Sequence, residues 1–246
     1  MQNSFSLFDI TFVNGDYNYI ISKLYKGCLM IVPSGPGLAT IGKDLRYTEA
    51  VQYADFAIPD SGYMILLLRI FKGIKIKKFS GYKFLKQFLN DESFFEKDLF
   101  LINPSEKEMR LNYKYLTNLG IPIDPSYQYT APIYSDGDIE DSYLLEKLNN
   151  LSQKPKYIII NLGSNTQEPL GYYLIKNLNF KPGIICTGAV IAFLTGTQAK
   201  IPSIIDKLYL GWLWRCIKTP KVFIPRYLKA FRLFFLILKS DVIITR

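Results

Sequence analysis

The sequence predicts an α/β protein whose mostly parallel sheet is covered by helices on both faces. Three observations favour this class. Short, continuous apolar runs typical of fully buried strands recur, at Cys28–Val32, Leu99–Ile102, Tyr157–Leu162 and Ile184–Cys186. Segments with apolar residues at helical spacing alternate with these runs, as in βαβ units. Loops rich in Gly, Pro, Ser and Asn follow the runs directly, where a parallel sheet has its strand ends.

The first ninety residues alternate between strand and helix signals. Gly27 and Gly73 each close a helix, and the Gly- and Pro-rich turn 33–37 is too irregular for regular structure. In chain order we expect strand 9–13, helix 17–26, strand 28–32, helix 38–53, strand 56–58, helix 63–71, the basic strand-like segment 74–80 and helix 81–90.

The alternation continues to residue 196. Ser105 is expected to cap a helix, because serine is a preferred residue at helix N-termini. Asp136 and Asp138 form an Asp-x-Asp pattern, for which a turn with a helix cap is favoured over a metal site. The expected elements are strand 99–102, helix 105–119, extended segment 121–123, helix 139–148, strand 157–162, strand 184–187 and a helix after Gly188.

Asp60 stands where the strand 56–58 ends and the next helix begins. In open α/β sheets, ligands bind outside the carboxyl ends of the strands. A carboxylate there, beside Ser61 and Gly62, could accept a proton from a sugar hydroxyl. The alternative is that Asp60 only caps the following helix, since Asp is a preferred cap residue.

Other strand-end loops are candidates for substrate contact. The turn of Ser34, Gly35 and Gly37 lacks the spacing of a dinucleotide fingerprint or a P-loop, so its phosphate-binding signal is weak. Lys78 beside a glycine turn could meet a phosphate, although such charge runs usually form a solvated edge. The remaining candidates, in two later loops that should meet the first ones along one sheet edge, are Gly163, Gln167, Glu168 and Gly188.

Composition excludes several kinds of chemistry. The chain of 246 residues has no histidine, which removes serine–histidine and cysteine–histidine catalysis and histidine-bound zinc. Cys28, Cys186 and Cys216 are far apart, so we expect free thiols in a reducing compartment. No apolar run is long enough to span a bilayer, and no signal peptide is evident. We expect a cytoplasmic protein without a metal or cofactor.

The positive charge is concentrated in the last forty residues. From Lys207 onward the chain has nine Lys or Arg and one acid, Asp241. We expect a helix from Pro225 with a basic stripe of Arg226, Lys229 and Arg232 and a broad apolar face. Such a helix is typical of an anionic membrane surface. Docking on the core remains an alternative, and nucleic acid is not expected because no matching motif accompanies the charge.

Five motifs in register resemble the WecG/TagA/CpsF glycosyltransferase family, glycosyltransferase family 26. The resemblance covers about residues 28–232. The matching segments are Ala54–Gly62, Lys78–Gly81, Asn161–Glu168, Leu210–Arg215 and Thr219–Tyr227. Departures occur at Val32, Ser34 and Ala192, and Lys78 replaces an arginine, which loses the guanidinium fork.

The resemblance implies a Rossmann-like domain, residues 1–202, and a membrane-associating helical appendage, residues 203–246. It implies an inverting, metal-independent enzyme that moves a hexosamine-type sugar from a UDP-sugar to a polyprenyl-diphosphate-linked saccharide. This would occur at the inner face of the cell membrane, in cell-surface polysaccharide synthesis. Asp60 matches the family's proposed base, and Arg215 and Arg226 match its diphosphate-binding arginines.

Two other hypotheses remain open. One is a non-catalytic relative that binds lipid-linked sugar or a partner transferase, motivated by the departures at Val32, Ser34 and Ala192. The other is a soluble nucleotide-binding protein whose basic tail docks on the core. The sequence names neither the sugar nor the linkage, and it leaves open whether the chain forms a homo-oligomer.

Overall fold

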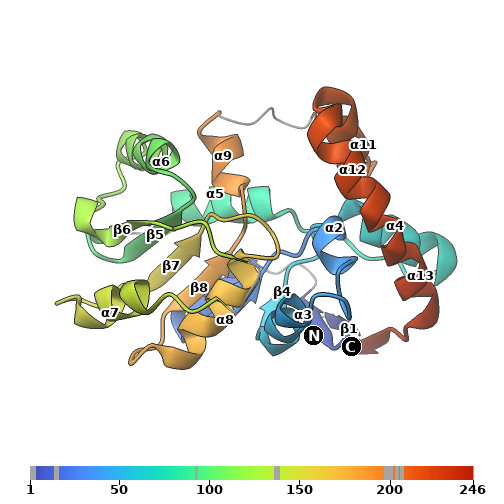
Figure 1. Ribbon diagram of the computed structural model, residues 1–246, viewed down its shortest axis with the longest axis horizontal. Coiled ribbons are helices and arrows are strands. Elements are labelled where there is room, and N and C mark those ends of the chain that lie inside the picture. The colour runs from blue at the N-terminus through green and yellow to red at the C-terminus, as the bar shows by residue number, and fades with distance from the viewer. Residues whose placement is uncertain are drawn as a thin grey trace.

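A mostly parallel sheet forms the centre of the protein. The computed structural model describes residues 4–13, 17–91, 94–135, 139–196, 202, 205 and 208–245. Within these residues the sheet has nine strands, in the order β6-β5-β7-β8-β3-β4-β2-β1-β9. The strands from β6 to β2 are parallel, whereas β1 pairs antiparallel with both β2 and β9 (Figure 1). The predicted α/β class is confirmed.

The strands are short and most are buried. Their bounds are β1 Ser4–Leu7, β2 Ile10–Val13, β3 Cys28–Ile31, β4 Phe56–Ala57, β5 Leu99–Asn103, β6 Gln128–Thr130, β7 Tyr157–Ile160, β8 Gly183–Cys186 and β9 Ile243–Thr245. The helices are α1 Tyr17–Tyr25, α2 Gly35–Leu38, α3 Leu45–Tyr53, α4 Gly62–Phe71, α5 Gly81–Asp91, α6 Glu106–Asn118, α7 Ser142–Asn150, α8 Gln167–Asn177, α9 Val190–Leu194, α11 Gly211–Lys218, α12 Pro220–Ala230 and α13 Arg232–Lys239.

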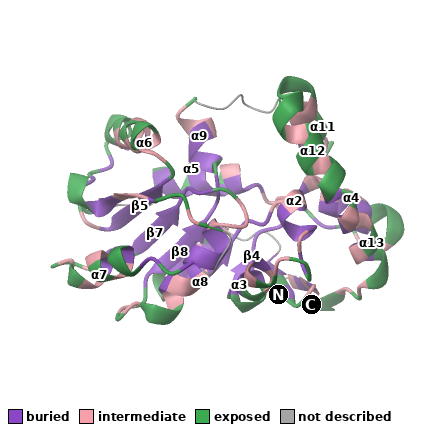
Figure 2. Ribbon diagram, in the orientation of Figure 1, coloured by how far each residue is buried: buried purple, intermediate pink, exposed green. Residues whose placement is uncertain are grey.

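Each face of the sheet has its own apolar core. Successive side chains of a strand point to opposite faces, so Leu29 and Ile31 join one core while Met30 joins the other. Helices α1, α5, α6 and α9 cover Met30's face, and α3, α4, α7, α8 and α13 cover the opposite one. Figure 2 shows the central strands buried and the helices exposing their outer sides.

Three details differ from the expectation for residues 33–80. The Gly- and Pro-rich turn contains a helical turn, α2, because the Ser34 side chain accepts the Gly37 N–H as an N-cap. The helix expected from residue 38 begins only at Leu45, since Gly42 adopts φ +75° and Asp44 caps the new start. The basic segment 74–80 forms no strand.

Both chain ends lie in the same edge of the sheet. Strand β1 forms a hairpin with β2, and β9 pairs with β1 from Ser4–Thr245 to Ser6–Ile243. The two ends are accordingly side by side (Figure 1). Sequence reasoning missed β1 and β9, because a run of three or four residues gives too little periodicity to be recognised.

Residues 208–245 of the tail form three helices and a strand, not one helix from Pro225. Helix α12 begins at Pro220, and Pro225 lies inside it. The predicted basic stripe is divided, because Arg226 and Lys229 are exposed while Arg232 donates to the carbonyls of Ala39 and Ile41. No helix among the described residues is long and apolar enough to cross a membrane.

Candidate active site

Four loops meet at the carboxyl edge of the parallel strands. They follow β3, β4, β7 and β8, which are neighbours in the sheet. The loop after β3 is packed closely on the loops after β4 and β7: a Cβ added to Gly35 would lie 3.0 Å from the Ser61 hydroxyl, and one added to Gly37 would collide with the Ser164 hydroxyl. The predicted residues Ser34, Gly35, Gly37, Ser61 and Gly163 are therefore gathered along this edge.

Asp60 is half-buried at the end of β4 and does not cap α4. The cap is Ser61, whose hydroxyl accepts the Met64 N–H at 3.2 Å. The Asp60 carboxylate instead accepts the backbone N–H of Gly81 at 3.3 Å. The helix-cap interpretation of Asp60 is wrong, because Ser61 takes that role and leaves the Asp60 carboxylate for other partners.

The bond to Gly81 brings the Lys78–Gly81 motif beside Asp60. The Phe79 N–H also donates to the Pro59 carbonyl, at 3.2 Å. Lys78, which is half-buried, belongs to this paired segment. A cationic side chain is thus carried on a loop that is fixed to the strand end holding the candidate base.

The C-terminal helices pack against the same strand end. A Cβ added to Gly62 would lie 2.7 Å from the Tyr209 carbonyl oxygen, so only glycine permits this approach. The Trp212 ring lies 5.6 Å from that of Tyr63 on α4 and 5.6 Å from that of Tyr227 on α12. These aromatic contacts dock α11 and α12 beside Asp60.

Tyr227 lies within electrostatic reach of Asp60 and of the two candidate arginines. Burial raises the pKa of its hydroxyl, the positive charges of Arg215 and Arg226 lower it, and the negative charge of Asp60 raises it. All three charges therefore act on one half-buried phenol. Sequence reasoning predicted no role for Tyr227, which is the last residue of the matching segment Thr219–Tyr227.

Arg215 is held between aromatic rings. Its guanidinium lies 5.1 Å from the centre of Phe193 on α9 and 5.8 Å from that of Phe223, which also has Arg226 at 5.8 Å. The Arg215 Nε is buried and has no hydrogen-bond partner among the described residues. A guanidinium stacked on a ring keeps its in-plane N–H groups for an anion.

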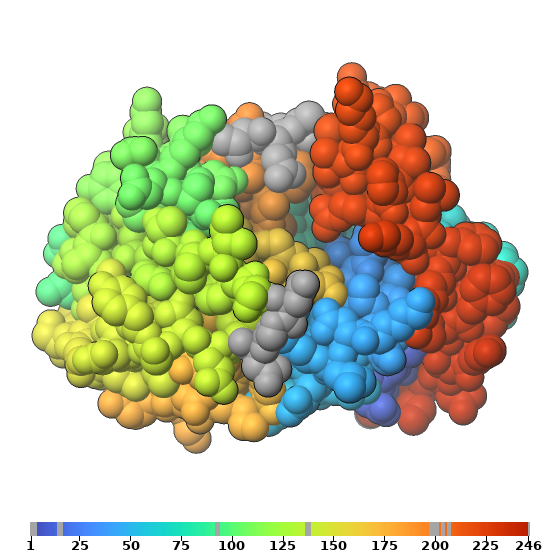
Figure 3. All heavy atoms as spheres, viewed as in Figure 1, coloured from blue at the N-terminus to red at the C-terminus, as the bar shows by residue number. Residues whose placement is uncertain are grey.

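A hollow lies beside the carboxyl edge of the sheet, between α9 and the tail helices. In Figure 3 it opens between the orange α9 and the red-orange α11 and α12, with the gold loop after β7 and the blue α2 region below. Helices α9, α11 and α12 and the loop after β7 thus border a recess that a ligand can enter. The Asp-x-Asp pattern of Asp136 and Asp138 lies outside the described residues.

Comparison with known proteins shows which family the chain belongs to. The profile of the glycosyl transferase WecG/TagA/CpsF family matches residues 5–245, nearly the whole chain. The chain belongs to this family. It is therefore a glycosyltransferase, and the resemblance found in its five motifs is confirmed.

One curated relative has a more specific name. This glycosyltransferase is 23% identical over 237 residues to the N-acetylglucosaminyldiphosphoundecaprenol N-acetyl-beta-D-mannosaminyltransferase of Bacillus subtilis (strain 168). The alignment covers 90% of this chain and 88% of the relative. These comparisons favour the enzyme over the non-catalytic relative that the sequence left open.

Gln167 and Glu168, which end the motif Asn161–Glu168, are both buried in this glycosyltransferase. Gln167 and Glu168 are 2% and 0% exposed, at the start of α8. The Gln167 side chain accepts the N–H of Gly188, which follows β8, at 2.6 Å. Desolvation raises the pKa of Glu168 to about 7, although hydrogen bonds from its neighbours oppose the shift. Both side chains thus underlie the loops and not the recess.

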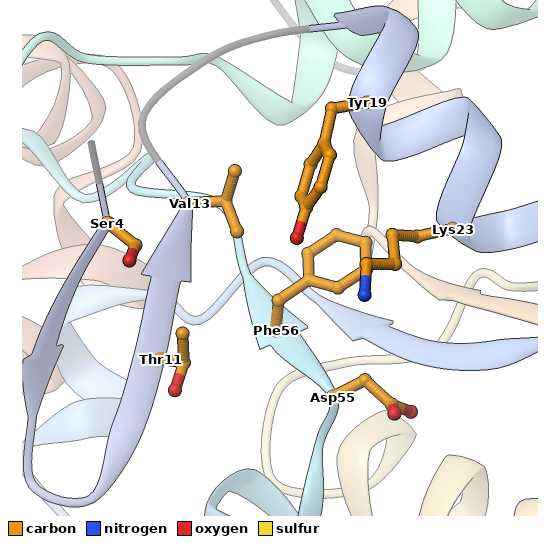
Figure 4. Close-up of a pocket in the computed structure, with 7 residues that line it drawn as sticks. All are labelled: Ser4, Thr11, Val13, Tyr19, Lys23, Asp55 and Phe56. Atoms are coloured by element: carbon orange, nitrogen blue, oxygen red, sulfur yellow. The ribbon is translucent and has the colours of Figure 1, made fainter. Parts of the chain in front are cut away.

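A separate pocket lies on the face of the sheet that α1 covers. It has a volume of about 220 Å³ and lies among β1, β2, α1 and β4, with Lys23 and Asp55 on its wall (Figure 4). Asp55 comes just before β4, whereas Asp60 comes after it. None of the predicted site residues lines this pocket, so it is not the recess of the glycosyltransferase site.

Proposed function

We propose that this glycosyltransferase moves an N-acetylhexosamine-type sugar from a UDP-sugar to a polyprenyl-diphosphate-linked saccharide. The name of the Bacillus relative, which describes an N-acetylmannosaminyl transfer to a lipid-linked diphosphate sugar, supports the classes of donor sugar and acceptor. The observation that carries the proposal is that α11 and α12, which hold Arg215 and Arg226, pack against the strand end that holds Asp60. One acidic and two basic groups at a recess suit the transfer of a sugar away from a diphosphate.

The reaction is an inverting single displacement. Asp60 removes the proton from the acceptor hydroxyl as the oxygen attacks the anomeric carbon of the donor. The new carbon–oxygen bond forms on the face opposite the leaving group, and the bond to the UDP oxygen breaks. Arg215, Arg226 and Lys78 stabilise the negative charge that develops on the departing diphosphate. The chain's own cations take this role in a metal-independent mechanism.

The loop residues position the substrates. Ser34, Gly35, Gly37, Ser61, Gly62, Gly163, Gln167, Glu168 and Gly188 are assigned to donor or acceptor binding, directly or by shaping the loops that do so. The absence of a side chain at the glycines lets backbone N–H groups approach a sugar or phosphate. The fixed loops reduce the entropy lost when two substrates are brought together.

The enzyme acts at the inner face of the cell membrane, in cell-surface polysaccharide synthesis. Exposed apolar side chains occur along the three tail helices, at Leu213, Ile217, Val222, Ile224, Leu228, Phe231, Phe235 and Leu238. Exposed Lys218, Lys221 and Lys229 accompany them. Apolar and basic groups together suit an anionic bilayer surface, which is also where a polyprenyl-linked acceptor resides.

Substitution of Asp60 tests the mechanism. UDP release from UDP-N-acetylhexosamines is measured with a lipid-linked acceptor for the native chain, Asp60→Asn and Asp55→Asn. Loss of a general base should reduce turnover by about a hundredfold or more. Asp55 is the matched control, because it flanks the other end of β4 and its carboxylate accepts only the Leu29 N–H at 2.8 Å among the bonds described. Native turnover in Asp60→Asn would overturn the assignment of the base.

A further inference from the structure

A buried carboxylate lies directly beneath the loop that follows β7. The Glu168 carboxylate accepts the Asn165 N–H at 2.9 Å and the Gln167 side-chain N–H at 3.0 Å. The Ser164 hydroxyl lies 3.5 Å from the same carboxylate. All three donors belong to the segment 164–167, so one side chain fixes the whole turn between β7 and α8.

The backbone of this turn requires such a partner. Asn165 adopts φ +71°, a left-handed conformation that is uncommon for a residue other than glycine. Its N–H is held by Glu168, and its side-chain amide donates to Thr40 at 2.7 Å and Asp44 at 3.2 Å. The turn is thereby tied to the segment between α2 and α3. An unfavourable backbone conformation persists only where surrounding contacts determine it.

The carboxylate also controls the turn after the next strand. A side-chain amide has one donor end and one acceptor end. Because Glu168 takes the donor end of Gln167, the Gln167 oxygen faces Gly188 and accepts its N–H at 2.6 Å. Gly188 has φ +65° and begins the turn from β8 to α9. Glu168 therefore orients Gln167, and Gln167 in turn holds the β8 turn.

We propose that Glu168 is a positioning residue, whose ionised carboxylate holds the β7 and β8 turns in the geometry that receives substrate without touching substrate itself. The inference rests on the proposed function in one respect, because that function assigns these turns to substrate binding. The role of Glu168 is to keep these two adjacent strand-end turns in one fixed arrangement. A buried ionised group costs stability, which explains its use only where it fixes functional loops.

Few other groups around Glu168 can titrate near neutral pH. Tyr47 of α3 and Cys186 of β8 face it, and burial raises the pKa of each well above its ordinary value. Both therefore stay neutral to pH 9. Asp44 is linked to Glu168 through Asn165. Its carboxylate accepts hydrogen bonds from the Asn165 side chain and from the Tyr47 N–H. A pH dependence near pH 7 that disappears on removal of the Glu168 carboxylate is then assignable to that group.

The test compares Glu168→Gln with Asp98→Asn in the full chain. Asp98 is a matched control, because it is 2% exposed and accepts the Phe95 N–H at 2.9 Å and Lys156 at 3.1 Å at the opposite edge of the sheet. We expect amide hydrogen exchange of residues 163–166 and 187–190 to accelerate about tenfold or more in Glu168→Gln only, the loss of about one hydrogen bond to a charged group. Gln167→Met removes the bond to Gly188 and one donor to Glu168 but keeps the bond from the Asn165 N–H to Glu168, so it should accelerate exchange at 187–190 and leave 163–166 near the native rate.

The kinetic readout separates positioning from plain stability. The native kcat should fall as pH drops below about 7, where Glu168 gains a proton. In Glu168→Gln, kcat should be at least tenfold lower with this acid limb absent, whereas the donor KM should change less than kcat. Asp98→Asn should keep the native pH profile.

Two results would overturn the positioning role of Glu168, and a third would overturn the proposed function instead. Native exchange in Glu168→Gln together with a large rise in donor KM would mean that Glu168 binds substrate directly and would overturn the inference. Fast exchange with a native pH profile and native kcat would reduce Glu168 to a structural role and also overturn it. If even the native chain shows no turnover but the exchange pattern appears, the positioning contacts are supported and the proposed function is overturned.

Discussion

Two carboxylates at the same edge of the sheet have different surroundings and therefore different uses. Asp60 is half-buried, and the bond described for its carboxylate is one 3.3 Å contact from Gly81. It keeps acceptor capacity for a substrate proton. Glu168 is fully buried and surrounded by donors from its own loop. Residues of equal chemistry can thus act as base or as positioning group, because environment sets the role of a carboxylate.

Replacement of Glu168 should change how stability depends on pH. Its pKa is raised by desolvation from 4.5 to about 7, so the folded protein binds this proton more tightly than the unfolded chain. Its stabilising contribution is complete below about pH 4.5 and is lost as the pH rises through 7. A shift of this size corresponds to a free energy on the order of 3 kcal/mol.

Urea unfolding of native protein and Glu168→Gln at pH 5 and pH 8 measures this effect. The glutamine variant should gain on the native protein by up to about 3 kcal/mol at pH 8 relative to pH 5, because glutamine does not ionise. The difference between the two proteins cancels contributions from other titrating groups. An unchanged difference would show that folding does not raise the pKa of Glu168.

The tail helices bury one side and expose the other. Leu233 and Ile237 of α13 lie in the apolar core, and Phe234 contacts Phe71 of α4 with ring centres 5.0 Å apart. Leu228 and Phe231, one turn away, are 71% and 57% exposed. The two alternatives left by the sequence, core docking and membrane contact, are therefore not exclusive. One set of side chains docks the tail on the core, and another is exposed and available for the proposed contact with a bilayer.

Vesicle flotation tests the exposed side. Leu228→Gln with Phe231→Gln should reduce binding to anionic vesicles about tenfold or more, because burial of one large apolar side chain is worth roughly 1.5–3 kcal/mol. The control is Ile133→Gln with Phe95→Gln, which removes side chains that are 102% and 70% exposed outside the tail. Binding should weaken with added salt and on neutral vesicles. Equal flotation of both double variants would contradict the membrane proposal.

At the scale of the whole molecule, the tail is tied to the sheet at several points. Its last strand, β9, pairs with β1, and Arg232 bonds to the carbonyls of Ala39 and Ile41 just beyond α2. Arg232 thus connects the tail to the segment that follows the Ser34–Gly37 turn. The predicted division at residues 202 and 203 remains a prediction, since residue 203 lies outside the described ranges.

A core substitution in the tail measures whether the chain unfolds as one unit. Leu233→Ala should reduce the free energy of the main unfolding transition by about 2–5 kcal/mol, because it leaves a cavity in the shared core. Leu228→Ala, exposed on the neighbouring helix, should change it by less than about 0.5 kcal/mol. A separate early transition in Leu233→Ala, with the main one unchanged, would mean that the appendage folds independently. Urea unfolding followed by circular dichroism distinguishes these outcomes.

The sequence by itself determined the class of the fold and the edge that carries the site. Continuous apolar runs such as Tyr157–Ile160 are typical of strands buried on both faces, and buried parallel strands require helices between them. Polar loops at the strand ends then have to meet along one edge. The motifs around Asp60, Gln167 and Arg215 were recognisable because their order and spacing are local properties of the chain.

Only the tertiary structure decided which of those residues cap a helix, which are buried and which stay accessible. Short strands such as β9 carry little local signal and form because a partner edge, β1, offers hydrogen bonds. The choice of Ser61 over Asp60 as the helix cap, and the burial of Glu168 under its loop, depend on neighbours far along the chain. Local sequence fixes which side chains stand at a strand end, whereas packing across elements fixes which of them meet the recess and which are buried beneath it.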